Sequence, residues 1–103
     1  MGAYVALLRV HLHFPEAESL KAKRSVLQSV KAQLHQRHGL TVAEVDHHEQ
    51  WQRATLAAAL TGGSLGPLEA ATDRVERWLE GRFPEGVRVE RVLASFEDLD
   101  HLA

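Results

Sequence analysis

Residues 4 to 14, YVALLRVHLHF, carry the pattern that most constrains the fold, because apolar and polar side chains alternate along most of their length. A two-residue period is typical of a β-strand with one buried face and one wet face. Pro15 ends the pattern, since proline has no amide hydrogen to donate to a neighbouring strand. Other parts of the chain must therefore cover one side of the sheet that contains this strand. The expected buried side is Tyr4, Ala6, Leu8, Val10, Leu12 and Phe14, and the wet side includes Arg9, His11 and His13.

A helix is predicted next, between Ser19 and Gly39. Serine is a favourable N-cap residue, and glycine supplies the left-handed conformation that ends many helices. Between these two residues, apolar side chains recur at the three- and four-residue spacing of a helix with one buried side. The residues at this spacing are Val26, Leu27, Val30 and Leu34.

Two strands are predicted in the middle of the chain. Residues 40–47, LTVAEVDH, alternate and contain β-branched side chains. Residues 51–60, WQRATLAAAL, would suggest a helix from their alanine content alone. We predict a strand there, because a two-layer domain needs sheet partners and every second residue belongs to one apolar row. That row consists of Ala54, Leu56, Ala58 and Leu60.

The last third of the chain predicts a helix and a strand. The turn TGGSLG leads into a helix that we expect to begin with Pro67 at its first position and to end near Phe83. VRVERVLASF then alternates as a final strand, and residues 97–103 form an acidic tail expected to fray or dock weakly. The order strand, helix, strand, strand, helix, strand predicts an α+β ferredoxin-like βαββαβ fold. This fold has a four-stranded antiparallel sheet with both helices on one face.

Size and composition set the broad class of the protein. With 103 residues, 45% hydrophobic and 25% charged, the sequence predicts a single domain with one core. The sequence contains no apolar run long enough for a membrane span, so we expect a soluble, cytoplasmic protein without a membrane partner. It also contains no cysteine, which excludes disulfides and cysteine-based zinc sites.

The net charge of −2 hides a local imbalance, because no Asp or Glu occurs from Ser19 to Ala43. At about 100° per residue, a helix places one group of basic and amide side chains together on a wet flank. This group is Lys21, Arg24, Gln28, Lys31 and His35. Lys23 and Arg37 instead project toward the apolar side, where their stems would cover the edge of the core while their charges reach solvent.

The cations within residues 21–24 oppose the helix dipole at a cost of up to about 1 kcal/mol each, so they need an explanation. In the first explanation, they join the free amide groups of the first turn in an anion site suited to phosphate. In the second, Glu16 and Glu18, or Glu44 and Asp46, neutralise them in a solvated ion-pair network. The sequence leaves both explanations open.

The tripeptide Trp51-Gln52-Arg53 places an aromatic ring beside a guanidinium group. Such a pair can stack on an unpaired nucleic-acid base. Alternatively, the Trp51 ring covers the edge of the core and binds no ligand. Both interpretations remain open at this point.

Other motifs predict neither a cofactor nor a catalytic site. The sequence has 7 histidines, but neither cysteines nor an HExxH run accompanies them, so we predict no metal site. His11 and His13 share a strand face and are expected to be exposed polar residues. GGSLG, residues 62–66, lacks the lysine and the spacing of a phosphate loop and indicates a turn. We therefore predict that the protein is not an enzyme.

The runs SLKAKRSVLQSVKAQL, LTVAEVD and WQRATLAAAL resemble the YlxP-like family of small bacterial proteins, a domain of unknown function, and the similarity covers residues 3–96. The resemblance implies a ferredoxin-like fold. It also implies a loose link to translation, because genes of this family often lie beside those of ribosome maturation and initiation factors. It implies no catalytic residues. The matching positions are Ser19, Leu20, Lys21, Lys23, Arg24, Glu44, Trp51, Gln52 and Arg53.

Two functional hypotheses follow from these observations. The first is a non-enzymatic binding module that engages structured RNA or the ribosome through the basic helix flank, with Trp51 and Arg53 nearby. The alternative is a homo-oligomeric interaction or regulatory module, a dimer or larger, without a nucleic-acid role. In the alternative, another subunit covers the open sheet face, including Val5, Leu7 and Val42, because an apolar sheet face needs cover.

Overall fold

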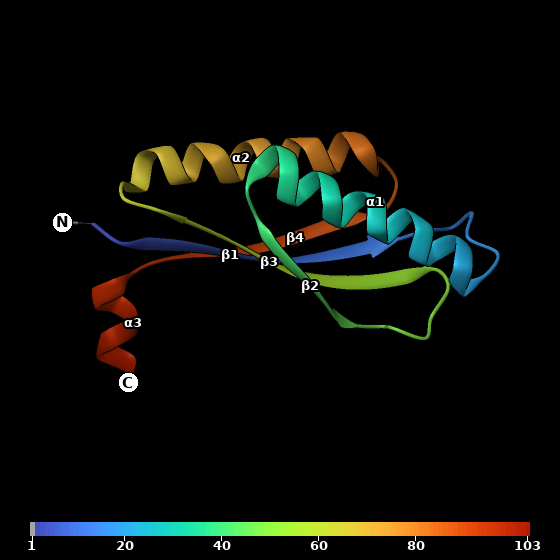
Figure 1. The fold of residues 1–103 in the computed structure, drawn as a ribbon, viewed down its shortest axis with the longest axis horizontal. Coiled ribbons are helices and arrows are strands. Elements are labelled where there is room, and N and C mark those ends of the chain that lie inside the picture. The colour runs from blue at the N-terminus through green and yellow to red at the C-terminus, as the bar shows by residue number, and fades with distance from the viewer. Residues whose placement is uncertain (1) are drawn as a thin grey trace.

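The computed structural model describes residues 2–103. Its elements follow the predicted order, with one additional short helix at the C-terminal end (Figure 1). They are β1 (Tyr4–His13), α1 (Leu20–His38), β2 (Thr41–Asp46), β3 (Arg53–Gly62), α2 (Leu65–Arg82), β4 (Val87–Ser95) and α3 (Phe96–Leu102).

The four strands form one antiparallel sheet in the order β2-β3-β1-β4, and α1 and α2 both cover the same face of it (Figure 1). This is the predicted ferredoxin-like fold. The opposite side of the sheet, called the open face below, is covered by neither long helix. None of the helices in residues 2–103 combines the length and the apolar character that a membrane span requires.

The core lies between the sheet and the two long helices. The predicted buried row of β1 is confirmed for residues 6–14, while Tyr4 at the strand's start is half-buried. The alanine-rich segment is the strand β3, and Ala54, Leu56 and Ala58 face the helices beside the larger side chains of β1. Alanine content favoured a helix here, but pairing with β1 on one side and β2 on the other outweighs a local preference of a few tenths of a kcal/mol per residue. From the helices, the core receives Leu27, Val30 and Leu34 of α1 and Val75 and Leu79 of α2.

Both predicted caps of α1 are confirmed. The Ser19 hydroxyl oxygen accepts a hydrogen bond from the Ala22 amide at 3.0 Å. Gly39 has a φ of 73° and donates its amide hydrogen to the carbonyl groups of the last turn. These caps fix where α1 enters and leaves the layer above the sheet, and they thereby fix which side chains of α1 point outward.

Several boundaries differ from the sequence prediction. The strand predicted at residues 51–60 is shifted by two residues, to Arg53–Gly62, and β2 is one residue shorter at each end than predicted. The helix α2 begins at Leu65, so Pro67 occupies its third position instead of its first. This is sterically allowed, because the first turn of a helix has no internal partners for its amide hydrogens. The C-terminal segment forms α3, whose start is held by a reciprocal capping box between Ser95 and Asp98, with both hydrogen bonds 3.0 Å long.

Candidate functional site

The outward flank of α1 carries the group of polar side chains that the sequence predicted. Lys21, Arg24, Gln28 and His35 are exposed, and Lys31 is partly exposed. We call these five residues the basic face of α1. Their common direction follows from the helical period, because Leu27, Val30 and Leu34 are buried on the opposite side.

One end of the basic face lies near the outer strand β2. His35 Nδ1 lies 3.0 Å from the carbonyl oxygen of Leu40, the residue just before β2. Because β2 is an edge strand, one of its sides pairs with no other strand. The His35 end of the basic face therefore lies near the start of this edge strand.

Carboxylates do not neutralise the basic face. Among residues 2–103, none lies within 4.0 Å of the charged nitrogen atoms of Lys21, Arg24 or Lys31. Glu16 and Glu18, which the sequence offered as neutralising partners, form no ion pair within the same range. The solvated network is therefore not formed around the exposed cations of α1.

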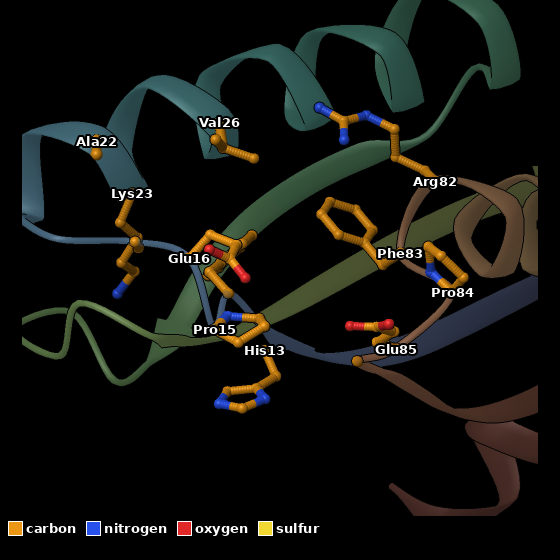
Figure 2. Close-up of a pocket in the computed structure, with 13 residues that line it drawn as sticks. His13, Pro15, Glu16, Ala22, Lys23, Val26, Arg82, Phe83, Pro84 and Glu85 are labelled. Carbon is orange, nitrogen blue, oxygen red and sulfur yellow. The ribbon is translucent and has the colours of Figure 1, made fainter.

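Lys23 does not belong to this exposed surface, contrary to its inclusion among the predicted anion-binding residues. Its side chain is 1% exposed, and its Nζ donates a 2.5 Å hydrogen bond to the His47 carbonyl oxygen. The same Nζ lies 3.3 Å from Glu44 Oε2. The side chain runs from α1 toward the turn after β2, as Figure 2 shows, so its charge does not reach solvent. Lys23 therefore anchors α1 to that turn.

Arg53 lies apart from the basic face, which corrects the expectation that it flanks this face. Arg53 begins β3 opposite His13, and both project from the open face, away from α1. Trp51 is 52% exposed, so it does not cover the core edge as one interpretation required. With His13 and Arg53, it lines a shallow depression of about 360 Å³.

A groove between α1 and α2 was missed by the sequence analysis. It holds about 360 Å³ and has an apolar floor that includes Val26, Phe14 and Phe83 (Figure 2). The two phenylalanine rings meet edge to face, 5.7 Å apart, and the Arg82 guanidinium lies 5.0 Å from the centre of the Phe83 ring. The sequence contains one indication of this groove, the Phe-Pro dipeptide that occurs at residues 14–15 and again at residues 83–84. The first pair follows β1 and the second follows α2, and both elements finish at the same end of the domain.

The open face is divided into a polar end and an apolar end. At the polar end, Glu90 accepts hydrogen bonds from Arg9 Nε at 2.9 Å and His11 Nε2 at 2.6 Å. These two partners lower the pKa of Glu90, with the His11 contact the larger cause. Toward the other end, Leu7 and Val92 are cross-strand partners and are 51% and 63% exposed. The open face thus combines an ordered charge cluster with an uncovered apolar surface.

The assignment of Val42 to the open face was wrong. Val42 pairs with Ala58, whose side chain is buried under the helices, and Val42 packs against the same core. The outward residues of β2 at this level are Thr41 and Ala43, which alternate with Val42 along the strand.

The histidines do not converge on a common point. In the part of the chain that the structure describes, no three His, Cys, Asp or Glu side chains are close enough together to hold a metal ion. His11 contacts Glu90 and has its Nδ1 3.3 Å from the Thr55 hydroxyl, whereas His35 contacts a backbone carbonyl. Their surroundings are those of structural polar residues.

Comparisons with known proteins extend these observations. The family described as "Protein of unknown function (DUF503)" matches residues 5–93. The uncharacterized protein YlxP of Bacillus subtilis (strain 168) is 28% identical over 82 residues, which cover 80% of this chain and 85% of YlxP. Among solved structures, the de novo designed protein Foldit4 is similar with a TM-score of 0.56 and 11% identity, over 89% of this chain and 96% of Foldit4. Foldit4 shares the fold alone, and the resemblance to YlxP-like proteins is confirmed.

Proposed function

The chain belongs to the DUF503 family of proteins of unknown function, and from this premise we propose that it is a non-enzymatic binding module that holds the phosphate backbone of structured RNA on the basic face of α1. One observation carries the proposal. Lys21, Arg24 and Lys31 project from one flank of a capped helix, and no carboxylate within residues 2–103 pairs with them.

The spacing of the cations suits a polyanion. From Lys21 to Lys31 the helix rises about 15 Å, at about 1.5 Å per residue. This length corresponds to roughly four nucleotides at the spacing of about 3.4 Å along one strand of double-stranded DNA, so it spans several phosphates of a nucleic-acid strand. Gln28 adds an amide donor between Arg24 and Lys31, and His35 lies one turn beyond Lys31. A row of this kind contacts consecutive phosphates and carries no base specificity of its own.

The open face is less suited to RNA than the basic face is. Four-stranded sheets that bind single-stranded RNA do so with aromatic side chains on their central strands. Here the open-face positions of the central strands β1 and β3 hold no Phe, Tyr or Trp within the residues that the structure describes. These positions are Val5, Leu7, Arg9, His11 and His13 of β1 and Arg53, Thr55, Ala57, Ala59 and Thr61 of β3. RNA as the polyanion agrees with the link to translation that the family resemblance implies.

The test measures the affinity for a structured ribosomal RNA fragment at several salt concentrations. Neutralising three phosphates releases their counterions, so the logarithm of the association constant should fall with the logarithm of salt with a slope of about −2 to −3. Changing Lys21, Arg24 and Lys31 together to Glu should abolish binding. The melting temperature should stay nearly unchanged, because exposed side chains contribute little to stability.

A matched control makes the same charge change on the other long helix. Arg74, Arg77 and Arg82 of α2 are exposed, and changing them to Glu alters the net charge equally. This control should retain RNA binding with at most a modest loss. Equal losses in both triple variants would indicate attraction to overall charge, and a flat salt response of the unmodified protein would reject the proposal.

A further inference from the structure

We propose that the open face of the sheet binds a second copy of the chain, in an antiparallel arrangement that places α3 of each copy on the basic end of the other copy's sheet. Three features carry this inference: an apolar floor, an acidic helix at one end of that floor, and a basic cluster at the other end. The inference is independent of the proposed RNA contact, because the basic face of α1 lies on the other side of the sheet.

The apolar floor lies on the half of the open face nearest the start of β1. Leu7 and Val92 are largely exposed there, and small side chains surround them. Burial of such a surface is favourable by about 25 cal/mol per Å². Antiparallel sheets tolerate one wet face when its residues are polar, but this half has few polar residues. The small neighbours are Val5, Ala57, Ala59 and Ala94.

The helix α3 extends from the sheet on the open-face side, as Figure 1 shows at the end where β1 begins. Phe96 donates its amide hydrogen to the Ala3 carbonyl oxygen at 2.7 Å, which fixes the start of the helix to the residue just before β1. The helix buries none of its residues, and Phe96, Leu99 and Leu102 are 62%, 48% and 80% exposed. A seven-residue helix without packing is only marginally stable. Its apolar side chains therefore lack the cover that a neighbouring molecule would provide.

A groove already exists between α3 and the floor. It measures about 460 Å³, and its lining includes Val5, Ala94, Phe96 and Leu99. A second sheet that lies on the floor would place side chains in this groove and would bury both of its apolar walls.

The charges at the two ends of the open face are opposite. The helix α3 carries Glu97, Asp98 and Asp100. The far end of the sheet carries more basic than acidic side chains, and Glu90 there already pairs with Arg9, His11 and Arg88. We call Arg9, Arg53 and Arg88, together with His11 and His13, the basic end.

This polarity selects one arrangement of two copies. A two-fold axis in the interface, perpendicular to β1 and at the level of Leu7 and Val92, reverses the strand direction. Each acidic α3 then lies over the partner's basic end, while Leu7 and Val92 meet the same side chains of the partner. An axis parallel to β1 would instead bring the two acidic helices together, where like charges repel. At about 3.3 Å per residue and about 4.8 Å between strands, the sheet face covers roughly 550 Å². With α3 added, the face approaches the roughly 800 Å² that each partner of a stable complex buries.

The test uses the full chain and measures its mass in solution by sedimentation equilibrium. The unmodified protein should be dimeric, and Leu7→Glu combined with Val92→Glu should make it monomeric. A matched control changes Val45 and Leu65 to Glu, which are 49% and 42% exposed and lie outside the floor. The control should remain dimeric. A monomer at every attainable concentration of the unmodified protein, or equal dissociation of both variants, would overturn the proposal.

A charge exchange tests the arrangement itself. Glu97→Lys combined with Asp100→Lys makes the charge of α3 positive. Arg53→Glu combined with Arg88→Glu makes the charge of the basic end more negative. Each pair alone should weaken dimerisation by about tenfold or more, because like charges then face each other across the interface. The chain with all four changes should recover the affinity of the unmodified protein. No recovery would overturn the antiparallel arrangement, and circular dichroism of each variant verifies that it is folded.

Discussion

Lys23 and Glu44 form an ion pair that connects α1 to β2, with Nζ and Oε2 3.3 Å apart. Lys23 is the largest fully buried side chain within residues 2–103, whereas 19% of the Glu44 side chain is exposed. The Lys23 ammonium directs its short hydrogen bond to the His47 carbonyl oxygen, and Glu44 Oε2 is left without an aligned donor. The pair is therefore a charge contact at the edge of the core, and its two members differ in their access to water.

This difference predicts unequal effects of removing either partner. Glu44→Gln leaves the ammonium of Lys23 buried without a negatively charged partner, which should lower the free energy of unfolding by about 1–3 kcal/mol. Lys23→Met keeps the apolar stem and removes the buried charge, and Glu44 can then be hydrated. Its cost should be about 1 kcal/mol or less. Urea denaturation measures both values.

The matched control for this prediction is Lys21→Met, because Lys21 is an exposed lysine two residues away. Its effect should stay within about 0.5 kcal/mol. If Lys23→Met lowers stability more than Glu44→Gln does, the burial of the ammonium is not the dominant cost.

Two glycines should respond in opposite directions to replacement by alanine. Gly39 ends α1 with a φ of 73°, which an L-residue adopts at a cost of about 1–2 kcal/mol, although an added methyl group would meet only Leu60 at 3.7 Å. Gly81 lies in the last turn of α2 with open space around it. Gly39→Ala should therefore destabilise the protein, and Gly81→Ala should stabilise it by about 0.5–1 kcal/mol. Thermal and urea unfolding measure both changes in stability. Changes of the same sign in the two variants would contradict the roles assigned to Gly39 and Gly81.

Glu90 should make the protein sensitive to acid. Its contacts with His11 and Arg9 lower its pKa below the ordinary value of 4.5, so in acid the unfolded chain binds a proton more readily than the folded chain. The stability from these contacts is complete above pH 4.5 and is lost as the pH falls through the lowered pKa of the folded state. Urea midpoints between pH 6 and pH 3 should fall less steeply for Glu90→Gln than for the unmodified protein. Parallel curves would show that the cluster contributes no pH dependence.

His38 should contribute a second pH dependence, closer to neutrality. Burial lowers its pKa below 6.5, and the charges of Arg37 and Arg74 lower it further. Its Nε2 is buried without a hydrogen-bond partner among residues 2–103, and its ring lies 5.5 Å from that of Trp78. Because the unfolded chain binds the proton more tightly, stability is complete above pH 6.5 and decreases as the pH falls below it.

The measurement for His38 compares melting temperatures of the unmodified protein and His38→Gln between pH 7.5 and 5.5. The slope should be smaller in the variant. His48 is exposed and serves as the matched position, so His48→Gln should leave the slope unchanged. The same loss of slope in both variants would assign the effect to histidines in general.

The fold could be predicted from the sequence because the buried residues of each strand or helix recur at the period of that element. The alternation in β1 and the helical spacing of Leu27, Val30 and Leu34 are local properties, and so are the caps at Ser19 and Gly39. The predicted start of α2 was two residues too late, because proline is compatible with several positions of a first turn.

Only some residues of the candidate site could be predicted from the sequence. The helical period alone places Lys21, Arg24 and Lys31 on one wet flank, and the structure has them there. The period also directs Lys23 inward, but only the distant turn at His47 and the carboxylate of Glu44 decide that its ammonium stays buried.

The amino-acid order by itself determined the succession of strands and helices, the side of each that is buried, and the charge imbalance of α1, because all three depend on neighbours within one or two turns. Only the tertiary structure decided that Trp51 is exposed, that Arg53 faces away from α1, and that acidic and basic groups occupy opposite ends of the open face. These relations join residues far apart in the chain, and their distances are fixed by strand pairing and packing between layers, which no local pattern encodes.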